Sequence, residues 1–266
     1  MEREVFAATK CLAAAASLAL FACATSRTLD QDLQLPTSTA EGGVPPGLAV
    51  TVTAKAILLD GALVAPIAAN RVDPKLKSEG EDGYRITPLV EALEKRTRRD
   101  GEAARHTGRP VATPLTLIAD RALSYRLFTE IIFSCGQAGY DKYDLVVKNA
   151  TDGSRVAIRY TIPSTPVGRD APPTTSVWVH LDEVSIVARG GASADIPKLA
   201  NGRHDYASLT ARLNALTAGA ADRGPVDLMA DESVPYEVVV ATMDALRRTP
   251  DGAPLFPAVQ FAAGVR

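Results

Sequence analysis

The stretch VDLMADESVPYEVVVATMDALRR, residues 226–248, contains the pattern that decides the fold. It begins with a short apolar run that stops at Asp231. Apolar side chains then recur at the i, i+3, i+4 and i+7 spacing of one helix face, at Tyr236, Val239, Val240, Met243 and Leu246. Pro235 falls at the start of this pattern, where its missing N–H costs nothing. The stretch predicts a buried strand, a tight turn and an amphipathic helix.

A near-copy of this stretch lies about 111 residues upstream. It reads LTLIADRALSYRLFTEIIFSCGQAGY, residues 115–140. Ala119, Asp120, Leu123 and Tyr125 stand in it where Ala230, Asp231, Val234 and Tyr236 stand in the later stretch. The repeat predicts two related units, each long enough for its own core. We therefore expect an α+β protein of two tandem small domains, each a mixed β-sheet with two helices packed on one face.

The remaining sequence sets the expected domain boundaries. Residues 1–24 are interpreted as a signal, a lipoprotein signal or a membrane anchor, and residues 25–47, polar and rich in Pro and Gly, as a flexible tether. The first predicted domain covers residues 48–162 and the second covers 176–266. Between them, residues 163–175 are interpreted as a Pro-rich linker. Within the domains, residues 100–110 and 190–202 are expected to be loops.

The N-terminal segment indicates export. Its apolar run, CLAAAASLALFAC from Cys11 to Cys23, is shorter than the roughly 20 residues that a helix needs to cross a bilayer. The last four residues of the run resemble a bacterial lipobox, which makes Cys23 the candidate lipidation site. An uncleaved anchor over residues 5–24, with Lys10 reaching the membrane surface, is a second interpretation. A plain cleaved signal is a third. All three place the bulk of the chain outside the cytoplasm.

Composition argues against several classes of function. The net charge is -2, from 29 basic and 31 acidic residues, and no basic face stands out. Aromatic residues make up only 5% of the chain, too few for platforms that stack on bases. We therefore expect no nucleic-acid partner. Cys135 is the one cysteine beyond the N-terminal segment, and its place on the apolar helix face predicts a buried, unreactive side chain.

The sequence contains no recognisable catalytic or cofactor motif. His106, His180 and His204 lie in different segments without further ligands at metal spacing, so each is interpreted as an exposed or strand-edge side chain. Asp120 and Asp231 follow their strands at matching positions. We expect each carboxylate to accept backbone N–H groups at its turn, the alternative being a general base. No enzymatic activity, cofactor or metal is predicted.

The order of these elements resembles the periplasmic domain of the ExbD/TolR family. Leu35 and Pro36 resemble the Leu-Pro element that follows the membrane segment in that family. Residues 115–147 resemble the family's block of strand, Ala-Asp turn, helix, Ala-Gly-Tyr and strand, and residues 226–261 resemble the same block again. The resemblance covers most of the chain twice, and a tandem pair of this kind would imitate the family's dimer.

The resemblance implies a function and its partners. It implies an envelope protein of a proton-motive-force-coupled system for biopolymer transport or outer-membrane integrity. The protein would be membrane-anchored, with its folded part in the periplasm. The implied partners are an ExbB/TolQ-like proton-channel protein and a TonB/TolA-like protein. Candidate partner-binding residues are Leu35, Pro36, Asp120, Tyr125, Asp231 and Tyr236.

Two of these assignments have an alternative. Tyr125 and Tyr236 either line a partner groove or anchor their helices against the sheet. For the whole protein, the alternative is a lipoprotein scaffold that binds peptidoglycan or another envelope protein, without a role in energy transduction. Residues 11–24 contain no Asp or Glu, whereas the family's membrane helix carries a proton-relaying aspartate. Either way, a sheet edge is expected to bind a peptide by strand addition.

Overall fold

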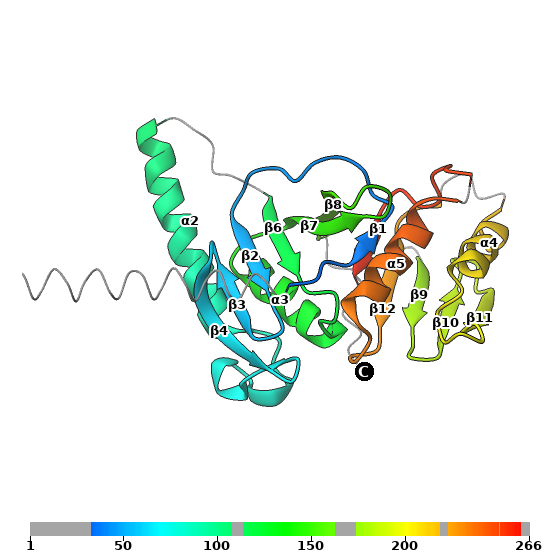
Figure 1. Ribbon diagram of the computed structural model, residues 1–266, viewed down its shortest axis with the longest axis horizontal. Coiled ribbons are helices and arrows are strands. Elements are labelled where there is room, and N and C mark those ends of the chain that lie inside the picture. The colour runs from blue at the N-terminus through cyan, green and yellow to red at the C-terminus, as the bar shows by residue number, and fades with distance from the viewer. Residues whose placement is uncertain (1–32, 108–113, 163–173, 219–222, 250, 262–266) are drawn as a thin grey trace, which may run out of the picture.

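The computed structural model describes residues 33–107, 114–162, 174–218, 223–249 and 251–261. In these residues the chain forms two mixed sheets and four helices (Figure 1). The α+β class is as expected from the sequence. None of the helices in these ranges combines the length and the apolar character that crossing a bilayer requires. Residues 1–24, with the candidate lipidation site Cys23, lie outside the described residues, as does most of the predicted linker.

The larger sheet belongs to the first half of the chain. Its eight strands are β1 (Thr37–Ser38), β2 (Ala49–Val52), β3 (Ala56–Leu59), β4 (Ala62–Ala68), β5 (Arg71–Val72), β6 (Leu115–Ala119), β7 (Lys142–Asn149) and β8 (Arg155–Thr161). The order is β1-β7-β6-β2-β3-β4-β5, and β8 pairs with β7. The helices are α2 (Thr87–Thr107) and α3 (Tyr125–Gln137), and two short 3₁₀ turns cover Pro74–Leu76 and Gly80–Asp82.

The smaller sheet belongs to the second half. Its strands are β9 (Thr175–Val179), β10 (Glu183–Val187), β11 (Ser193–Pro197), β12 (Val226–Ala230) and β13 (Val259–Phe261), in the order β11-β10-β9-β12-β13. The helices are α4 (Tyr206–Leu216) and α5 (Tyr236–Arg247). Figure 1 shows this half beside the first, with α5 in front of its sheet.

The two sheets repeat one plan. Strands β7-β6-β2-β3-β4 correspond to β13-β12-β9-β10-β11: three parallel strands are followed in each case by two antiparallel ones. The register agrees as well, because Val52 pairs with Ala119 and Val179 with Ala230. Strands β1, β5 and β8 are additions to the first unit. The repeat predicted from two short stretches therefore extends through both sheets.

Burial follows the periodicity of the sequence. Along β12, Val226, Leu228 and Ala230 face the core, while the residues between them are half-buried. In each unit the two helices contact each other, α2 with α3 and α4 with α5. Two helix starts, those of α3 and α4, are capped by side chains: the N–H of Leu127 donates to Ser124 Oγ, and the N–H of Ser208 to Asp205 Oδ1 at 2.9 Å. Each sheet thus buries one face under its pair of helices.

Part of the predicted tether is instead built into the fold. β1 extends the first sheet by pairing with β7. On the other side of the segment, Asp244 of α5 accepts hydrogen bonds from Ser38 Oγ at 2.8 Å and from the N–H of Thr39 at 2.7 Å. The prediction of a free tether over residues 25–47 is therefore wrong for residues 34–40. Composition suggested a linker because this segment is held by backbone and polar contacts, which leave no apolar periodicity.

Two predicted loops are also regular structure. Residues 193–197, within the expected loop 190–202, form the edge strand β11. Only Ile196 of this strand is buried, so no alternation marks it in the sequence. Residues 100–107 continue α2. That part of the helix is polar and solvent-exposed, and the pair Arg96–Asp100 at i, i+4 stabilises its start.

Candidate functional site

The turns that precede α3 and α5 pair with each other across the two units. The N–H of Tyr125 donates to the carbonyl of Val234 at 2.8 Å, and the N–H of Tyr236 donates to that of Leu123 at 2.7 Å. Ser124 and Pro235 lie opposite each other in an antiparallel bridge.

A second pair of bonds follows the same rule. The N–H of Arg126 donates to the carbonyl of Glu232 at 3.0 Å, and the N–H of Glu237 donates to that of Arg121 at 2.9 Å. Each bond becomes its partner when the two copies of the repeat are exchanged. This is the pattern of an isologous contact about a local two-fold axis, here within one chain.

Tyr125 and Tyr236 are buried in this contact, with 5% and 0% of their surface exposed. Phe128 stacks on Tyr236 with ring centroids 4.8 Å apart. The ring centroid of Tyr125 lies 6.4 Å from that of Phe128. Burial raises the pKa of both phenols. Tyr125 Oη donates to the carbonyl of Leu228, whereas Tyr236 Oη is buried without a hydrogen-bond partner among the described residues. Both rings join the two units and do not line an open groove.

Asp120 accepts backbone N–H groups, as expected. Its Oδ2 binds the N–H of Gln34 and its Oδ1 that of Ala122, both at 2.9 Å. The carboxylate is buried and fastens the N-terminal segment to the turn. Beside it, Leu35 is half-buried and Pro36 is buried, and the carbonyl of Pro36 accepts the N–H of Lys148 at 2.8 Å. These three candidate positions for partner binding, with Tyr125 and Tyr236, therefore stand at or beside the junction of the units.

Asp231 differs from Asp120 although it occupies the same place in the repeat. It accepts Trp178 Nε1 at 2.9 Å and lies 3.1 Å from His180 Nδ1. The expectation that Asp231 binds backbone N–H groups at its turn is wrong: its recorded partners are side chains. Trp178 and His180 were missed because they are distant in sequence. The register of β9 beside β12 is the signal that brings them to Asp231.

The other candidate groups for chemistry are isolated. Cys135 is buried and free, and burial raises the pKa of its thiol. His204 is also buried, and burial lowers its pKa, so the prediction of an exposed or strand-edge side chain is wrong there. Within the part of the chain that is described, no group of three or more His, Cys, Asp or Glu side chains is placed to hold a metal ion.

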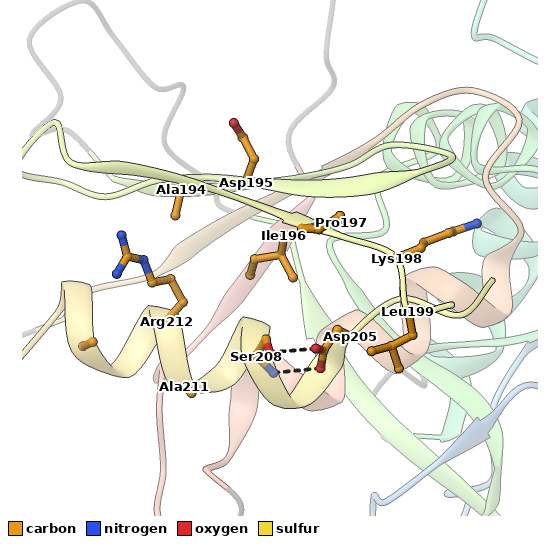
Figure 2. Close-up of a pocket in the computed structure, with 11 residues that line it drawn as sticks. Ala194, Asp195, Ile196, Pro197, Lys198, Leu199, Asp205, Ser208, Ala211 and Arg212 are labelled. Atoms are coloured by element: carbon orange, nitrogen blue, oxygen red, sulfur yellow. Dashed lines mark hydrogen bonds between the residues drawn. The ribbon is translucent and has the colours of Figure 1, made fainter. Parts of the chain in front are cut away.

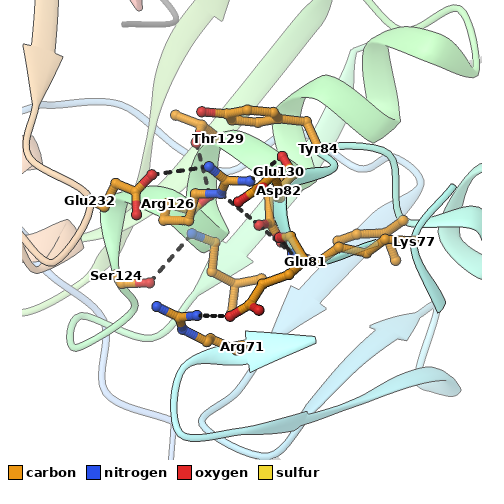
Figure 3. Close-up of polar contacts among 12 residues, drawn as sticks. Arg71, Lys77, Glu81, Asp82, Tyr84, Ser124, Arg126, Thr129, Glu130 and Glu232 are labelled. Atoms are coloured by element: carbon orange, nitrogen blue, oxygen red, sulfur yellow. Dashed lines mark hydrogen bonds and ion pairs between the residues drawn. The ribbon is translucent and has the colours of Figure 1, made fainter. Parts of the chain in front are cut away.

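A buried ionic network stabilises the first unit beside the paired turns (Figure 3). Lys77 Nζ lies 2.6 Å from Glu130 Oε1, and both side chains are less than 5% exposed. Arg126 binds the same carboxylate through Nε at 2.8 Å and reaches Glu232 of the second unit at 3.0 Å. Its guanidinium also lies 4.0 Å from the ring centroid of Tyr84. The network therefore ties the segment before α2 to α3 and crosses to the other unit.

A groove lies between β11 and α4, at the end of the molecule farthest from the first unit (Figures 1 and 2). Its volume is about 770 Å³. Figure 2 shows Ile196 pointing from the strand toward α4, while Asp195 points away from the helix. The helix side is lined by small residues, Ser208, Ala211 and Ala215, and by Arg212. This shape leaves room for side chains of a peptide that lies along the strand.

The outer edge of β11 presents unpaired backbone groups to that groove. No described strand pairs with β11 on the side away from β10. The N–H of Ala188 donates to the carbonyl of Ala192, and the N–H of Lys198 donates to that of Asp182. These bonds show that the backbone groups of Ala192 and Lys198 point toward β10. Because alternate residues of an antiparallel strand face opposite sides, Ser193 and Asp195 direct their N–H and C=O groups outward. The carbonyl of Pro197 is a fifth outward group.

Comparison with protein-family models, with curated proteins and with solved structures finds no match to this chain. The geometry on which a function can be argued is therefore the chain's own: a local two-fold contact, a half-exposed Asp-His-Trp cluster and an open strand edge. Of these, the strand edge and its groove form the candidate binding site.

Proposed function

We propose that this chain is an ExbD/TolR-like protein of the bacterial cell envelope that acts by binding proteins in the periplasm. It would serve a proton-motive-force-coupled system for biopolymer transport or outer-membrane integrity, beside an ExbB/TolQ-like proton-channel protein and a TonB/TolA-like protein. The observation that carries the proposal is the isologous pairing of the turns before α3 and α5. Members of the family dimerise through or near this domain, and one chain with two copies joined in this way reproduces such a dimer.

The proposed binding surface is the edge of β11 with the groove beside α4. Strand addition supplies affinity through backbone hydrogen bonds and specificity through pockets for alternate side chains. Ser193 and Asp195 offer the backbone groups, and the groove offers the pocket. The strand is short and carries a charge and a proline, features that protect an edge from uncontrolled pairing. A partner would therefore need to match a restricted segment of the edge.

The test combines a deletion with a groove variant in the native host. Deleting the chain is expected to impair outer-membrane uptake or to raise detergent sensitivity. Ala211→Trp, which fills the groove, is expected to give the same defect and to abolish co-purification with the TonB/TolA-like protein. Ala207→Trp is the matched control, because Ala207 is exposed on α4 and does not line the groove. Unchanged uptake and detergent resistance after deletion contradict the proposal.

The second candidate function is a scaffold that holds peptidoglycan or another envelope protein. The same purification distinguishes it from the transport function. Co-sedimentation with cell wall, together with no recovery of a proton-channel protein, favours the scaffold. Mass spectrometry of the mature N-terminus adds a further distinction. A diacylglyceryl group on Cys23 would replace a spanning helix as the anchor and remove a direct place in a proton motor.

A further inference from the structure

A second groove lies where the edges of the two sheets approach each other. Its volume is about 690 Å³, and β8 forms one side and the segment leading into β13 the other. The residues that matter for its chemistry are Arg159 and Thr161 of β8, Arg247 and Arg248 at the end of α5, and Val259 of β13. The groove lies on other strands than the β11 edge and is independent of that site.

Comparison of the two units shows that β13 lacks a neighbour that its counterpart has. β7 is flanked by β6 on one side and by β8 on the other. β13, which holds the place of β7 in the second sheet, pairs with β12 and with no other described strand. In the described residues, the second unit therefore ends in an unpaired edge where the first unit has one more strand.

The backbone groups of both edges face the groove. The N–H of Val226 donates to the carbonyl of Ala258, so in this parallel ladder Val259 and Phe261 are the residues that face away from β12. The N–H of Phe261 indeed donates to Tyr160 Oη at 3.3 Å. On β8, the N–H of Ile162 donates to the carbonyl of Asp141 and so points toward the β7 side. The backbone groups of Arg159 and Thr161 therefore point away from β7. The outward backbone groups of Val259 are therefore the ones that an extended peptide along β13 would meet, with β8 as the facing wall.

The charge of the groove specifies the peptide. Three arginines line it and no Asp or Glu does. Asp144, buried behind the groove, holds Arg159 Nε at 2.5 Å. Arg247 and Arg248 form no ion pair with any residue in the described ranges. Two unpaired guanidinium groups favour carboxylates at the rim, where charge complementarity contributes to specificity and to the rate of association.

We propose that the groove between β8 and β13 binds an extended, acidic peptide segment of a partner protein as an added strand. The peptide's backbone pairs with Val259 of β13, and the edge of β8 with Arg159 and Thr161 forms the opposite wall of the groove. Its carboxylates face Arg247 and Arg248. The added strand supplies to the second unit the neighbour that β8 gives to the first.

The test is selection from a library of random octapeptides on the purified, folded chain. We expect enrichment of peptides in which Asp or Glu alternates with β-branched residues. The double variant Arg247→Glu/Arg248→Glu should weaken binding of the selected peptide by about tenfold or more. N-methylation of alternate peptide nitrogens should weaken it similarly, because the strand loses its donors. Arg247→Lys/Arg248→Lys, which keeps the charge, should retain most of the binding and guards against misfolding of the charge-reversed protein.

Matched controls separate this site from other sources of binding. Arg99→Glu/Arg105→Glu changes the net charge equally but acts on α2, and it should leave the affinity unchanged. Ala211→Trp in the β11 groove should also have no effect, so the two proposals fail independently. Enrichment of neutral or basic peptides overturns the inference, as does equal affinity of the N-methylated peptide. Selection of no peptide together with arginine-dependent binding to phosphatidylglycerol vesicles would assign the groove to a lipid surface and overturn it as well.

Discussion

The two units share one strand plan but differ in what surrounds it. The first has three additional strands, the long helix α2 and a buried ionic network around Glu130. The second has the five shared strands, and among the described residues both of its outer strands, β11 and β13, have no further neighbour. At the position of Glu130 in the repeat, α5 carries Ala241. Polar side chains thus tie the first unit together internally, while the second unit presents edges.

Because of this difference, the two copies of the duplicated domain can have different roles, one structural and one in binding. A copy with more strands and a buried ionic network provides a rigid base, and the two-fold contact fixes the other copy relative to it. The second copy can then leave backbone groups unpaired without losing its place, although free edges carry a risk of aggregation. We interpret the first unit as the scaffold and the second as the binding unit.

The largest expected effect is a loss of stability in the first unit when its buried ionic network is broken. Glu130→Ala leaves Lys77 buried without its carboxylate and takes one partner from Arg126. Removing one member of a buried ion pair costs about 3–5 kcal/mol of stability, because the remaining charge is uncompensated. The free energy of unfolding, measured with a chemical denaturant, should fall by about this amount.

A double variant sharpens this prediction. In Lys77→Met/Glu130→Met both charges of the pair are replaced by apolar side chains of similar size, and much of the loss should be recovered. If the single and double variants are equally unstable, the packing of Glu130 matters more than its charge. If Glu130→Ala is neutral, the network does not stabilise the first unit.

The matched aspartates give the next effect. Asp120→Ala removes the buried carboxylate that accepts the N–H groups of Gln34 and Ala122, so we expect a loss of about 2 kcal/mol. Asp231→Ala acts on a side chain that is 37% exposed and should cost about 0.5–1 kcal/mol. Trp178 is the single tryptophan, and its fluorescence should change in the Asp231 variant, because the indole loses its acceptor. Equal costs at the two positions would contradict the different roles assigned here.

Sequence patterns could predict the elements that repeat and that bury an apolar face. The strand-turn-helix blocks at β6–α3 and β12–α5 are marked by their own periodicity, and the cap at Asp205 by its residue type. The contact between the blocks could not be predicted, because it is formed by backbone groups of Leu123, Val234 and their neighbours, and side-chain patterns do not report on these. The same holds for β11, whose single buried residue leaves no alternation.

The candidate site was predictable only in part. A peptide-binding sheet edge was expected, but which edge remains free follows from strand order, and strand order depends on pairings between distant segments. The cluster of Asp231, His180 and Trp178 had no local signal for the same reason: its members lie on neighbouring strands that are about 50 residues apart in sequence. The duplicated tyrosines, in contrast, were recognisable as a pair, and the structure places them together at the two-fold contact.

These tyrosines give the smallest and sharpest test of the comparison. Tyr125→Phe removes a hydroxyl that donates to the carbonyl of Leu228, and we expect a loss of about 0.5–1.5 kcal/mol. Tyr236→Phe removes a hydroxyl that is fully buried and has no partner among the described residues. Such a group costs desolvation energy in the folded state, so its removal should be neutral or stabilising by up to about 1 kcal/mol.

The comparison has an internal control, because the same substitution is made at two positions that correspond in the repeat and that keep their rings in one aromatic stack. Denaturant unfolding of the two single variants and of the double variant measures both effects and their coupling. Equal losses at the two positions would mean that Tyr236 Oη has a partner, for example a buried water, and that the contact is more symmetric in its side chains than the recorded hydrogen bonds indicate. Opposite signs would show that duplication preserved the backbone pairing while the side-chain bonds across it diverged.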